Sequence, residues 1–247
     1  MKKIINLFGL LFFLLFSSTS FSQTADEVID KYIETIGGKE KLLSIHSMQY
    51  TGSQNYYGIY ESIVITEVHD SLLRYDIEAY GKKGFWMVTK SIGGEFFPWE
   101  NGNKKYFSEA EVKVQQGALN IYDPLLSFKQ DTATAHYIGI KKVDSIPCYF
   151  LYLEYPSGKR VYYWFDSETH LLKQSQKYYR MITSQNDKLN SHDLTKFSAW
   201  RDIDGVLFPF IKTTDVFVNK VKVAQKSFFF TDIQINPIIS PKLYRIP

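Results

Sequence analysis

The stretch Gly37-Gly38-Lys39 has residue types that could form a phosphate-binding loop. Backbone amides of a glycine-rich loop cradle phosphates where the loop reads G-x-x-x-x-G-K-[ST] and joins a strand to a helix. Here the spacing is different, Glu40 follows the lysine, and an amphipathic helical pattern precedes the glycines. Glycine is also the usual residue at a helix end, because it adopts a positive φ without strain. We therefore predict a helix end at Gly37 and no nucleotide site.

Two carboxylates and a histidine, Asp166, Glu168 and His170, lie close together in the sequence and could do general acid–base chemistry. They fall in a turn signal between two apolar strand patterns, where solvated polar residues are expected. No orienting partner or pocket accompanies them in the sequence. We therefore interpret them as turn residues.

Metal and nucleophile chemistry have little support in the sequence. The histidines are dispersed, with no H-x-x-x-H pair and no neighbouring cysteine, so that no metal site is predicted. They are His46, His69, His136, His170 and His192. The single cysteine, Cys148, lies in an apolar strand pattern and is expected to be a structural thiol. With no G-x-S-x-G motif either, we expect no catalytic residue, no cofactor and no enzyme activity.

The first 22 residues have the pattern of a secretory signal peptide. Lys2 and Lys3 precede an apolar run, Ile4–Phe16, and small and polar residues follow it. A membrane-spanning helix needs about 20 apolar residues, so an uncleaved anchor is the weaker alternative. We expect cleavage between Ser22 and Gln23, where no cysteine is present to carry a lipid anchor. The mature chain, residues 23–247, is expected to be exported and soluble.

Composition narrows the classes of partner and of fold. Removal of Lys2 and Lys3 lowers the formal net charge from +3 to +1, and this near-neutrality argues against a nucleic-acid partner. A single cysteine excludes an internal disulfide. Stability must then come from an apolar core, and the length of the mature chain suits one domain.

The mature chain begins with a helical pattern. Thr24 and Glu27 form a capping-box signature, in which each side chain binds the backbone amide of the other residue. The apolar residues that follow have helical spacing. They are Ala25, Val28, Ile29, Tyr32, Ile33 and Ile36. A short helix over 39–45 and a first strand over Ser47–Ser53 are expected next.

Beyond residue 46 the pattern is that of strands joined by hairpins. Tyr75, Ile77 and Ala79 alternate with the polar residues Arg74, Asp76 and Glu78, which predicts a half-buried strand. Turn signals recur along the chain, and such spacing is typical of an antiparallel meander. These signals are His69-Asp70, Gly81–Gly84, Gly93-Gly94, Asn101-Gly102, Ser157-Gly158, Asp166–Thr169, Asp204-Gly205 and Asn219-Lys220.

Two segments interrupt the meander. Residues 108–122 begin with the capping-box pair Ser108 and Glu111 and predict a helix or helical loop, which Asp123-Pro124 ends. Residues 184–191, SQNDKLNS, are interpreted as a long hairpin loop.

Two strands are apolar on both faces, at 148–155 and 161–165. In a simple antiparallel sheet one face is exposed to water and carries polar side chains. Because these strands are apolar on both faces, the second face must also be covered. Helices or a bound apolar ligand would both cover it. A sheltered cavity and a fully packed interior both remain open at this point.

Four segments, taken together, resemble the periplasmic lipoprotein-carrier (LolA/LolB-like) superfamily, in its outer-membrane lipoprotein-sorting-like branch. They are ADEVIDKYIETIGGKEKLLSIHSMQYTG (25–52), YWFDSETHLL (163–172), WRDIDGVLFPF (200–210) and INPIISPKLYRIP (235–247). The resemblance implies a mainly β (β-rich α+β) fold, a strongly curved antiparallel unclosed half-barrel with helices covering its concave face. Residues 23–247 would form this single domain, in the periplasm of a Gram-negative bacterium.

The resemblance also implies a function without catalysis, the carrying of lipid or lipoprotein acyl chains in a hydrophobic cavity under a helical lid. Inner- and outer-membrane lipoprotein-transfer proteins would be its partners. An Arg-Pro pair that helps to close the lid in the best-known carrier has no counterpart in Val68-His69-Asp70-Ser71, so the cargo need not be a lipoprotein. The alternative is a ligand-free structural envelope module that binds a protein through its sheet edge or lid.

Ten apolar and aromatic residues are our candidates for the cavity lining, and each would also suit plain core packing. Four lie on the apolar side of strands whose other side is polar: Met48, Tyr50, Tyr75 and Ile77. Six lie on strands whose facing the sequence leaves ambiguous: Trp86, Tyr152, Trp164, Phe208, Phe210 and Phe229.

Overall fold

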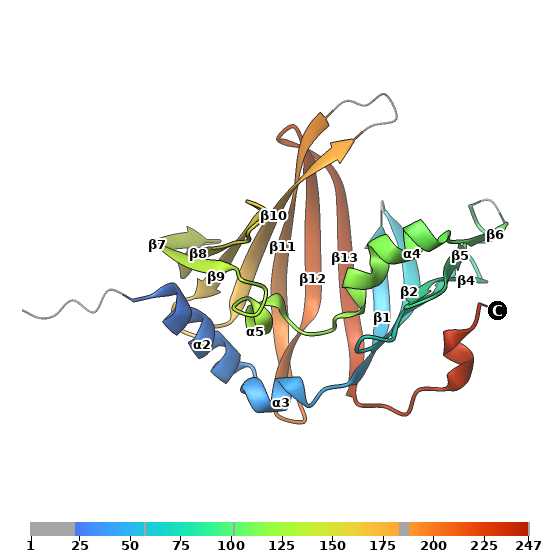
Figure 1. Cartoon of the computed structure of the whole chain (residues 1–247), viewed down its shortest axis with the longest axis horizontal. Coiled ribbons are helices and arrows are strands. Elements are labelled where there is room, and N and C mark those ends of the chain that lie inside the picture. The colour runs from blue at the N-terminus through green and yellow to red at the C-terminus, as the bar shows by residue number, and fades with distance from the viewer. Residues whose placement is uncertain (1–22, 57, 101, 183–187, 247) are drawn as a thin grey trace, which may run out of the picture.

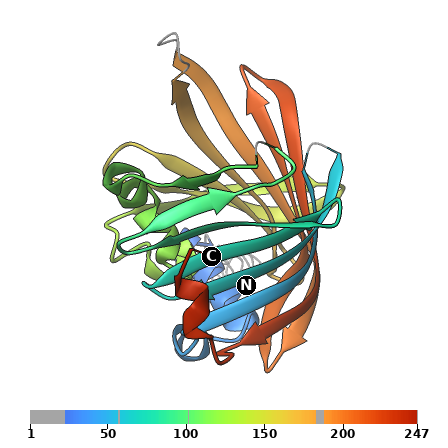
Figure 2. The ribbon, with the colours of Figure 1, turned by 90° about the vertical axis from the view of Figure 1, so that its right-hand side faces the viewer.

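A computed structural model describes residues 23–56, 58–100, 102–182 and 188–246. Thirteen strands form one antiparallel sheet in the order β6-β5-β4-β3-β2-β1-β13-β12-β11-β10-β9-β8-β7. The sheet curves strongly around the helices and does not close, because β6 and β7 lie at opposite edges (Figures 1 and 2). The predicted fold class, a mainly β unclosed half-barrel with helices on its concave face, is therefore confirmed.

Neighbouring strands in the sheet are also neighbours in the sequence, except that β1 pairs with β13. The strands are β1 (Ser47–Tyr56), β2 (Ile59–Val68), β3 (Leu72–Ala79), β4 (Lys82–Thr89), β5 (Gly93–Phe96), β6 (Lys104–Tyr106), β7 (Thr134–Val143), β8 (Ile146–Glu154), β9 (Arg160–Asp166), β10 (Leu172–Ile182), β11 (Lys188–Ile203), β12 (Val206–Val218) and β13 (Val221–Ile235). Two meanders, β1–β6 and β7–β13, are thus joined along β1 and β13.

The helix α2 (Ala25–Thr35) packs its apolar face on the concave side of the sheet. The capping box is confirmed: Thr24 Oγ1 accepts from the Glu27 amide at 3.2 Å, and Glu27 Oε2 accepts from the Thr24 amide at 2.8 Å. Gly37 has φ +132°, and a Cβ there would lie 2.9 Å from the Gly205 carbonyl oxygen, so glycine is required. Helix α3 (Lys39–Leu43) follows, slightly shorter than expected. Within the described residues, no helix is long and apolar enough to cross a bilayer.

The connection from β6 to β7, residues 107–133, crosses the concave side of the sheet from one edge to the other (Figure 1). It contains α4 (Glu109–Gln115), the 3-10 turn η1 (Gln116–Leu119) and α5 (Pro124–Ser127). The capping box of Ser108 and Glu111 is confirmed, although the helical part ends before Asp123. We call residues 107–133 the lid.

Two predictions about turns are corrected. Gly93-Gly94 is not a turn but the start of β5, where the glycines let β6 and the residue after it approach closely. A Cβ at Gly93 would lie 2.5 Å from the Phe107 ring, and one at Gly94 would lie 2.7 Å from the Lys105 carbonyl oxygen. The loop expected at 184–191 is also shorter, because β11 begins at Lys188; residues 183–187 lie outside the described residues. The signal peptide expected at 1–22 lies outside them as well.

A C-terminal segment, residues 239–246, lies on the outer face of β2–β5 (Figure 2), and we call it the strap. It includes the 3-10 turn η2 (Pro241–Tyr244). Its apolar side chains, among them Leu243 and Ile246, pack against Leu72, Phe85 and Met87 of the sheet. An apolar patch of the outer face is therefore removed from water by the far end of the chain.

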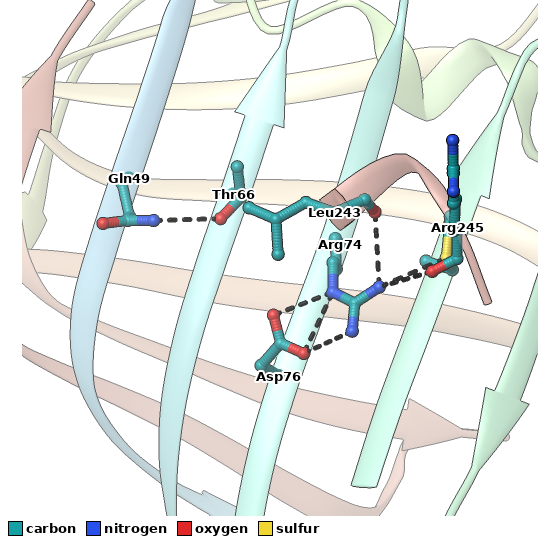
Figure 3. A network of polar contacts seen from close by, with 7 residues as sticks. Gln49, Thr66, Arg74, Asp76, Leu243 and Arg245 are labelled. Carbon is teal, nitrogen blue, oxygen red and sulfur yellow. Dashed lines mark hydrogen bonds and ion pairs between the residues drawn. The ribbon is translucent and has the colours of Figure 1, made fainter. Parts of the chain in front are cut away.

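Arg74 fastens the strap to the sheet, as Figure 3 shows. Its guanidinium donates to the Asp76 carboxylate, with Nη2 and Oδ1 2.7 Å apart, and to the carbonyl oxygens of Leu243 (3.3 Å) and Arg245 (3.2 Å). Arg74 is only 5% exposed, so the expectation that this side of β3 faces water is wrong at Arg74. The strap covers Arg74 on the outer face of β3, and the local sequence pattern of β3 does not indicate that another segment lies there.

The substitution Arg74→Met should lower the free energy of unfolding by about 2 to 3 kcal/mol, because it leaves two carbonyl oxygens and a carboxylate without their donor. Chemical denaturation measures this loss. Arg160→Met is the matched control, since Arg160 pairs with Glu154 at 2.8 Å on the exposed surface. Loss of an exposed pair costs less than about 1 kcal/mol. Equal losses in the two variants would show that Arg74 does not fasten the strap.

Candidate functional site

The concave side of the sheet contains a cavity of about 460 Å³ beneath α2, α3 and the lid. Helices, lid and strands all contribute apolar side chains to its wall. They include Ile36, Met48, Ile121, Leu126, Leu207 and Phe208. We call it the main cavity. Because its walls come from segments far apart in the sequence, it exists only in the folded protein.

A second chamber of about 450 Å³ lies beneath α4 and against β1–β4. Its wall is rich in aromatic and aliphatic side chains. They include Leu73, Tyr75, Ile77, Trp86, Phe97 and Trp99. The concave side therefore offers two apolar compartments, one under each end of the lid.

Seven of the ten candidate residues face the concave side. Met48, Tyr50 and Phe208 line the main cavity, and Tyr75, Ile77 and Trp86 line the second chamber. Phe210 is 3% exposed in the core and lines neither compartment. Whether the six lining residues bind a ligand stays a prediction.

The other three candidates, Tyr152, Trp164 and Phe229, lie on the outer face. Trp164 stacks on Phe150 at 4.5 Å in a small separate core, and Tyr152 stacks on His136 at 4.7 Å. Phe229 is 37% exposed. The strands of Tyr152 and Trp164 are apolar on both faces, and Phe229 lies in a run of three phenylalanines, so the sequence alone could not assign which face each side chain occupies. We remove these three from the candidate set.

Sequence reasoning missed the charged residues of the main cavity. Glu67 of β2 and Lys212 of β12 both line it. A signal was present in the period-two alternation of the strands: Lys212 continues the apolar positions Phe208 and Phe210, and Glu67 continues Ile65. Every second residue of a strand lies on the same face, so a charged residue two positions after a buried apolar one points toward the covered side.

A hydrogen bond ties α2 to the lid at one end of the main cavity. The Tyr32 hydroxyl donates to Asp123 Oδ2 at 2.9 Å, and Asp123 Oδ1 accepts from the Leu125 amide at 2.9 Å. Asp123 thereby caps α5, whose first residue, Pro124, has no amide to satisfy. Burial raises the pKa of the Asp123 carboxyl, and these two hydrogen bonds oppose the shift. Burial also raises the pKa of the Tyr32 hydroxyl, which therefore stays a donor.

Glu67 and Lys212 influence each other without touching. Among the described residues, no hydrogen bond or ion pair within 4.0 Å joins either charge to another side chain, although the Lys212 ammonium lies 5.6 Å from the Tyr50 ring centre. Burial raises the pKa of the Glu67 carboxyl, and the attraction of Lys212 opposes this. Burial lowers the pKa of the Lys212 ammonium, and Glu67 and Asp123 oppose this. Both charged groups are therefore held in the cavity at a desolvation cost.

Two of the residues that could suggest catalysis, Asp166 and Cys148, have structural roles. Asp166 Oδ1 accepts from the amides of Glu168 (2.9 Å) and Thr169 (3.1 Å), which confirms the predicted turn. Cys148 is 0% exposed, and burial raises the pKa of its thiol, so the reactive thiolate is disfavoured. No group of three His, Cys, Asp or Glu residues that could hold a metal occurs in the part of the chain that the structure describes.

The stability of the protein should depend on pH through Glu67. Its pKa is raised above the ordinary value of 4.5 in the folded protein, so folded Glu67 binds a proton more tightly than unfolded Glu67 does. The wild type should therefore lose unfolding free energy relative to Glu67→Gln as the pH rises above the ordinary pKa of 4.5. Denaturation at several pH values measures the difference. Glu78→Gln removes an exposed charge from the same sheet and is the matched control. A constant difference between wild type and Glu67→Gln would contradict the prediction.

No protein-family model matches the sequence, and no curated protein matches it either. Among solved structures, the chain is similar to a LolA superfamily protein from Nitrosomonas europaea, at 12% identity and a TM-score of 0.55 over 91% of this chain and 99% of that chain. It is similar to a DUF1329 family protein from Desulfovibrio piger, at 13% identity and a TM-score of 0.54 over 88% and 95%. It is also similar to an outer membrane lipoprotein-sorting protein domain from Vibrio parahaemolyticus, at 8% identity and a TM-score of 0.51 over 89% and 98%. The resemblance expected from the sequence motifs is therefore confirmed at the level of the fold, and the protein has the LolA-like fold.

Proposed function

We propose that this protein binds the acyl chain of a lipid or lipoprotein in its concave cavities and carries it across the periplasm, without making or breaking a bond. The observation that carries the proposal is the main cavity, a mainly apolar space of about 460 Å³ beneath α2, α3 and the lid. Ligand pockets in proteins hold roughly 300 to 1,000 Å³, so this volume suits a small amphiphile. Each methylene group moved from water into such a space contributes about 0.8 kcal/mol.

The arrangement of the lid supports this proposal. Ile121 and Leu126 of the lid are only half-buried, because they face the main cavity. The second chamber gives a longer or second chain a further apolar compartment. One similar structure is described as a lipoprotein-sorting domain, which agrees with a role in handling acylated molecules. In this proposal residues 1–22 direct export and are removed, and membrane proteins of the two envelope membranes load and unload the carrier.

The alternative, a ligand-free module that binds a protein through the edge of its sheet, has weaker support. The edge strand β7 contains a bulge at Gly139, followed by Lys141 and Lys142. At the other edge, β6 is only three residues long. Bulges, lysines and short edge strands are the features by which proteins prevent pairing at an open edge.

The first test is to purify residues 23–247 from the periplasm without detergent and to compare native and denaturing mass spectra. Co-purification of a lipid or an acylated peptide is the expected result and would identify the cargo class. A ligand-free mass, together with no uptake of a fluorescent fatty acyl probe, would contradict the proposal.

A cavity-filling substitution should separate binding from stability. Ile121→Trp together with Leu126→Trp places two indole rings in the main cavity and should weaken binding of a fluorescent acyl probe at least about tenfold, because the chain loses buried apolar contact. Val114→Trp is the matched control, since Val114 lies on the same lid and is 80% exposed. Thermal unfolding checks that all variants fold. Equal probe affinity in the filled and control variants would show that the main cavity is not the binding site.

A further inference from the structure

Glu67 and Lys212 both line the main cavity, from strands on either side of the two strands that carry Tyr50 and Phe230. Glu67 lies on β2, Tyr50 on β1, Phe230 on β13 and Lys212 on β12, which is the order of these strands in the sheet. The rings of Tyr50 and Phe230 lie 5.0 Å apart, and the Lys212 ammonium lies 5.6 and 5.7 Å from their centres. The Lys212 ammonium thus lies beside both rings, and Glu67 lies near enough for each charge to influence the pKa of the other.

The charges that line the main cavity show no excess of positive charge. Its acidic residues are Glu67, Asp123 and Asp193, and its basic residues are Lys177 and Lys212. Asp123 accepts the Tyr32 hydroxyl, and Asp193 Oδ1 accepts the Tyr179 hydroxyl at 2.8 Å. A ligand carboxylate or phosphate at Lys212 would bring a further negative charge close to Glu67 and Asp123. Like charges in a desolvated site repel strongly, so an anionic head group is disfavoured there.

The two unpaired groups have complementary requirements. An ammonium group only donates hydrogen bonds and an ionised carboxylate only accepts them. A ligand that displaces water from the cavity must then offer an acceptor to Lys212 and a donor to Glu67. A bare hydrocarbon supplies neither, a fatty-acid carboxylate supplies only the acceptor, and a fatty amine supplies only the donor. An uncharged head group that carries a carbonyl oxygen beside an O–H or N–H supplies both.

We propose that Glu67 and Lys212 together recognise an uncharged head group, in which a carbonyl oxygen accepts from Lys212 and a hydroxyl or amide hydrogen donates to Glu67. The ligand class is then an acyl ester or amide, such as a monoacylglycerol, and not a free fatty acid. This inference rests on the proposed acyl binding and adds the chemistry of the head group. Sites built to hydrogen-bond a ligand discriminate strongly against analogues that leave their buried polar groups unpaired.

The test compares three probes with the same twelve-carbon chain: 1-monolauroylglycerol, laurate and dodecylamine. Calorimetric titration of the wild-type protein at about pH 7.5 should give an affinity for 1-monolauroylglycerol at least about tenfold higher than for either charged probe. In the double variant Glu67→Gln/Lys212→Met, which removes both charges at once, the preference should fall to about threefold or less. Lys142→Met, on the exposed edge strand β7, is the matched control and should keep the wild-type preference.

The outcomes separate this inference from the proposed function. Binding of none of the three probes to the wild type would overturn acyl binding itself. Binding of laurate as tightly as 1-monolauroylglycerol would overturn the inference and leave the proposed function standing. A preference that survives in the double variant would show that other residues recognise the head group, and would also overturn the inference. Because the wild-type preference is measured without any substitution, the test holds even where a variant unfolds.

Discussion

The positions of β6 and β7 are the constraint on which the rest of the structure depends. These strands are consecutive in the chain but lie at opposite edges of the sheet, so the lid has to cross its whole width. Twelve strand spacings of about 4.8 Å make an arc of roughly 58 Å, and a curved sheet shortens the direct path across its concave side. The lid takes this path, and α2 and α3 lie beside it (Figure 1). The covered concave side, with its two compartments, therefore follows from strand order and curvature together.

The charged residues on the two faces of the sheet have opposite degrees of pairing. Arg74 has a carboxylate and two carbonyl oxygens as partners, so its charge is compensated and it joins the strap to the sheet. Glu67 and Lys212 line the main cavity, and no described residue forms an ion pair with either of them. Desolvated groups of this kind reduce stability, and apolar residues of similar size would pack at lower cost. Residues that reduce stability in this way are typical of sites selected for binding.

Much of the fold could be predicted from the sequence because its signals are local. Capping boxes at Thr24 and Ser108, turn residues and alternating strands each depend on a few neighbouring residues. The candidate site was predicted less well. Where a strand is apolar on both faces, the helices decide which of its side chains point into the cavity, and the sequence of the strand does not record where the helices lie. Trp164 and Phe208 have similar local sequence patterns, yet only Phe208 reaches the cavity. The cover over Arg74 comes from a segment about 170 positions away, which no local pattern records.

The pairing of β1 with β13 has a consequence for the order in which the molecule can be assembled. β1 ends at Tyr56, and its second partner begins only at Val221, so the first meander keeps one edge open until the last strand of the chain docks on it. Contacts of such long sequence separation make folding slow. Intermediates that expose strand edges and apolar surface are prone to aggregation, so the period before β13 docks on β1 is the vulnerable stage of folding.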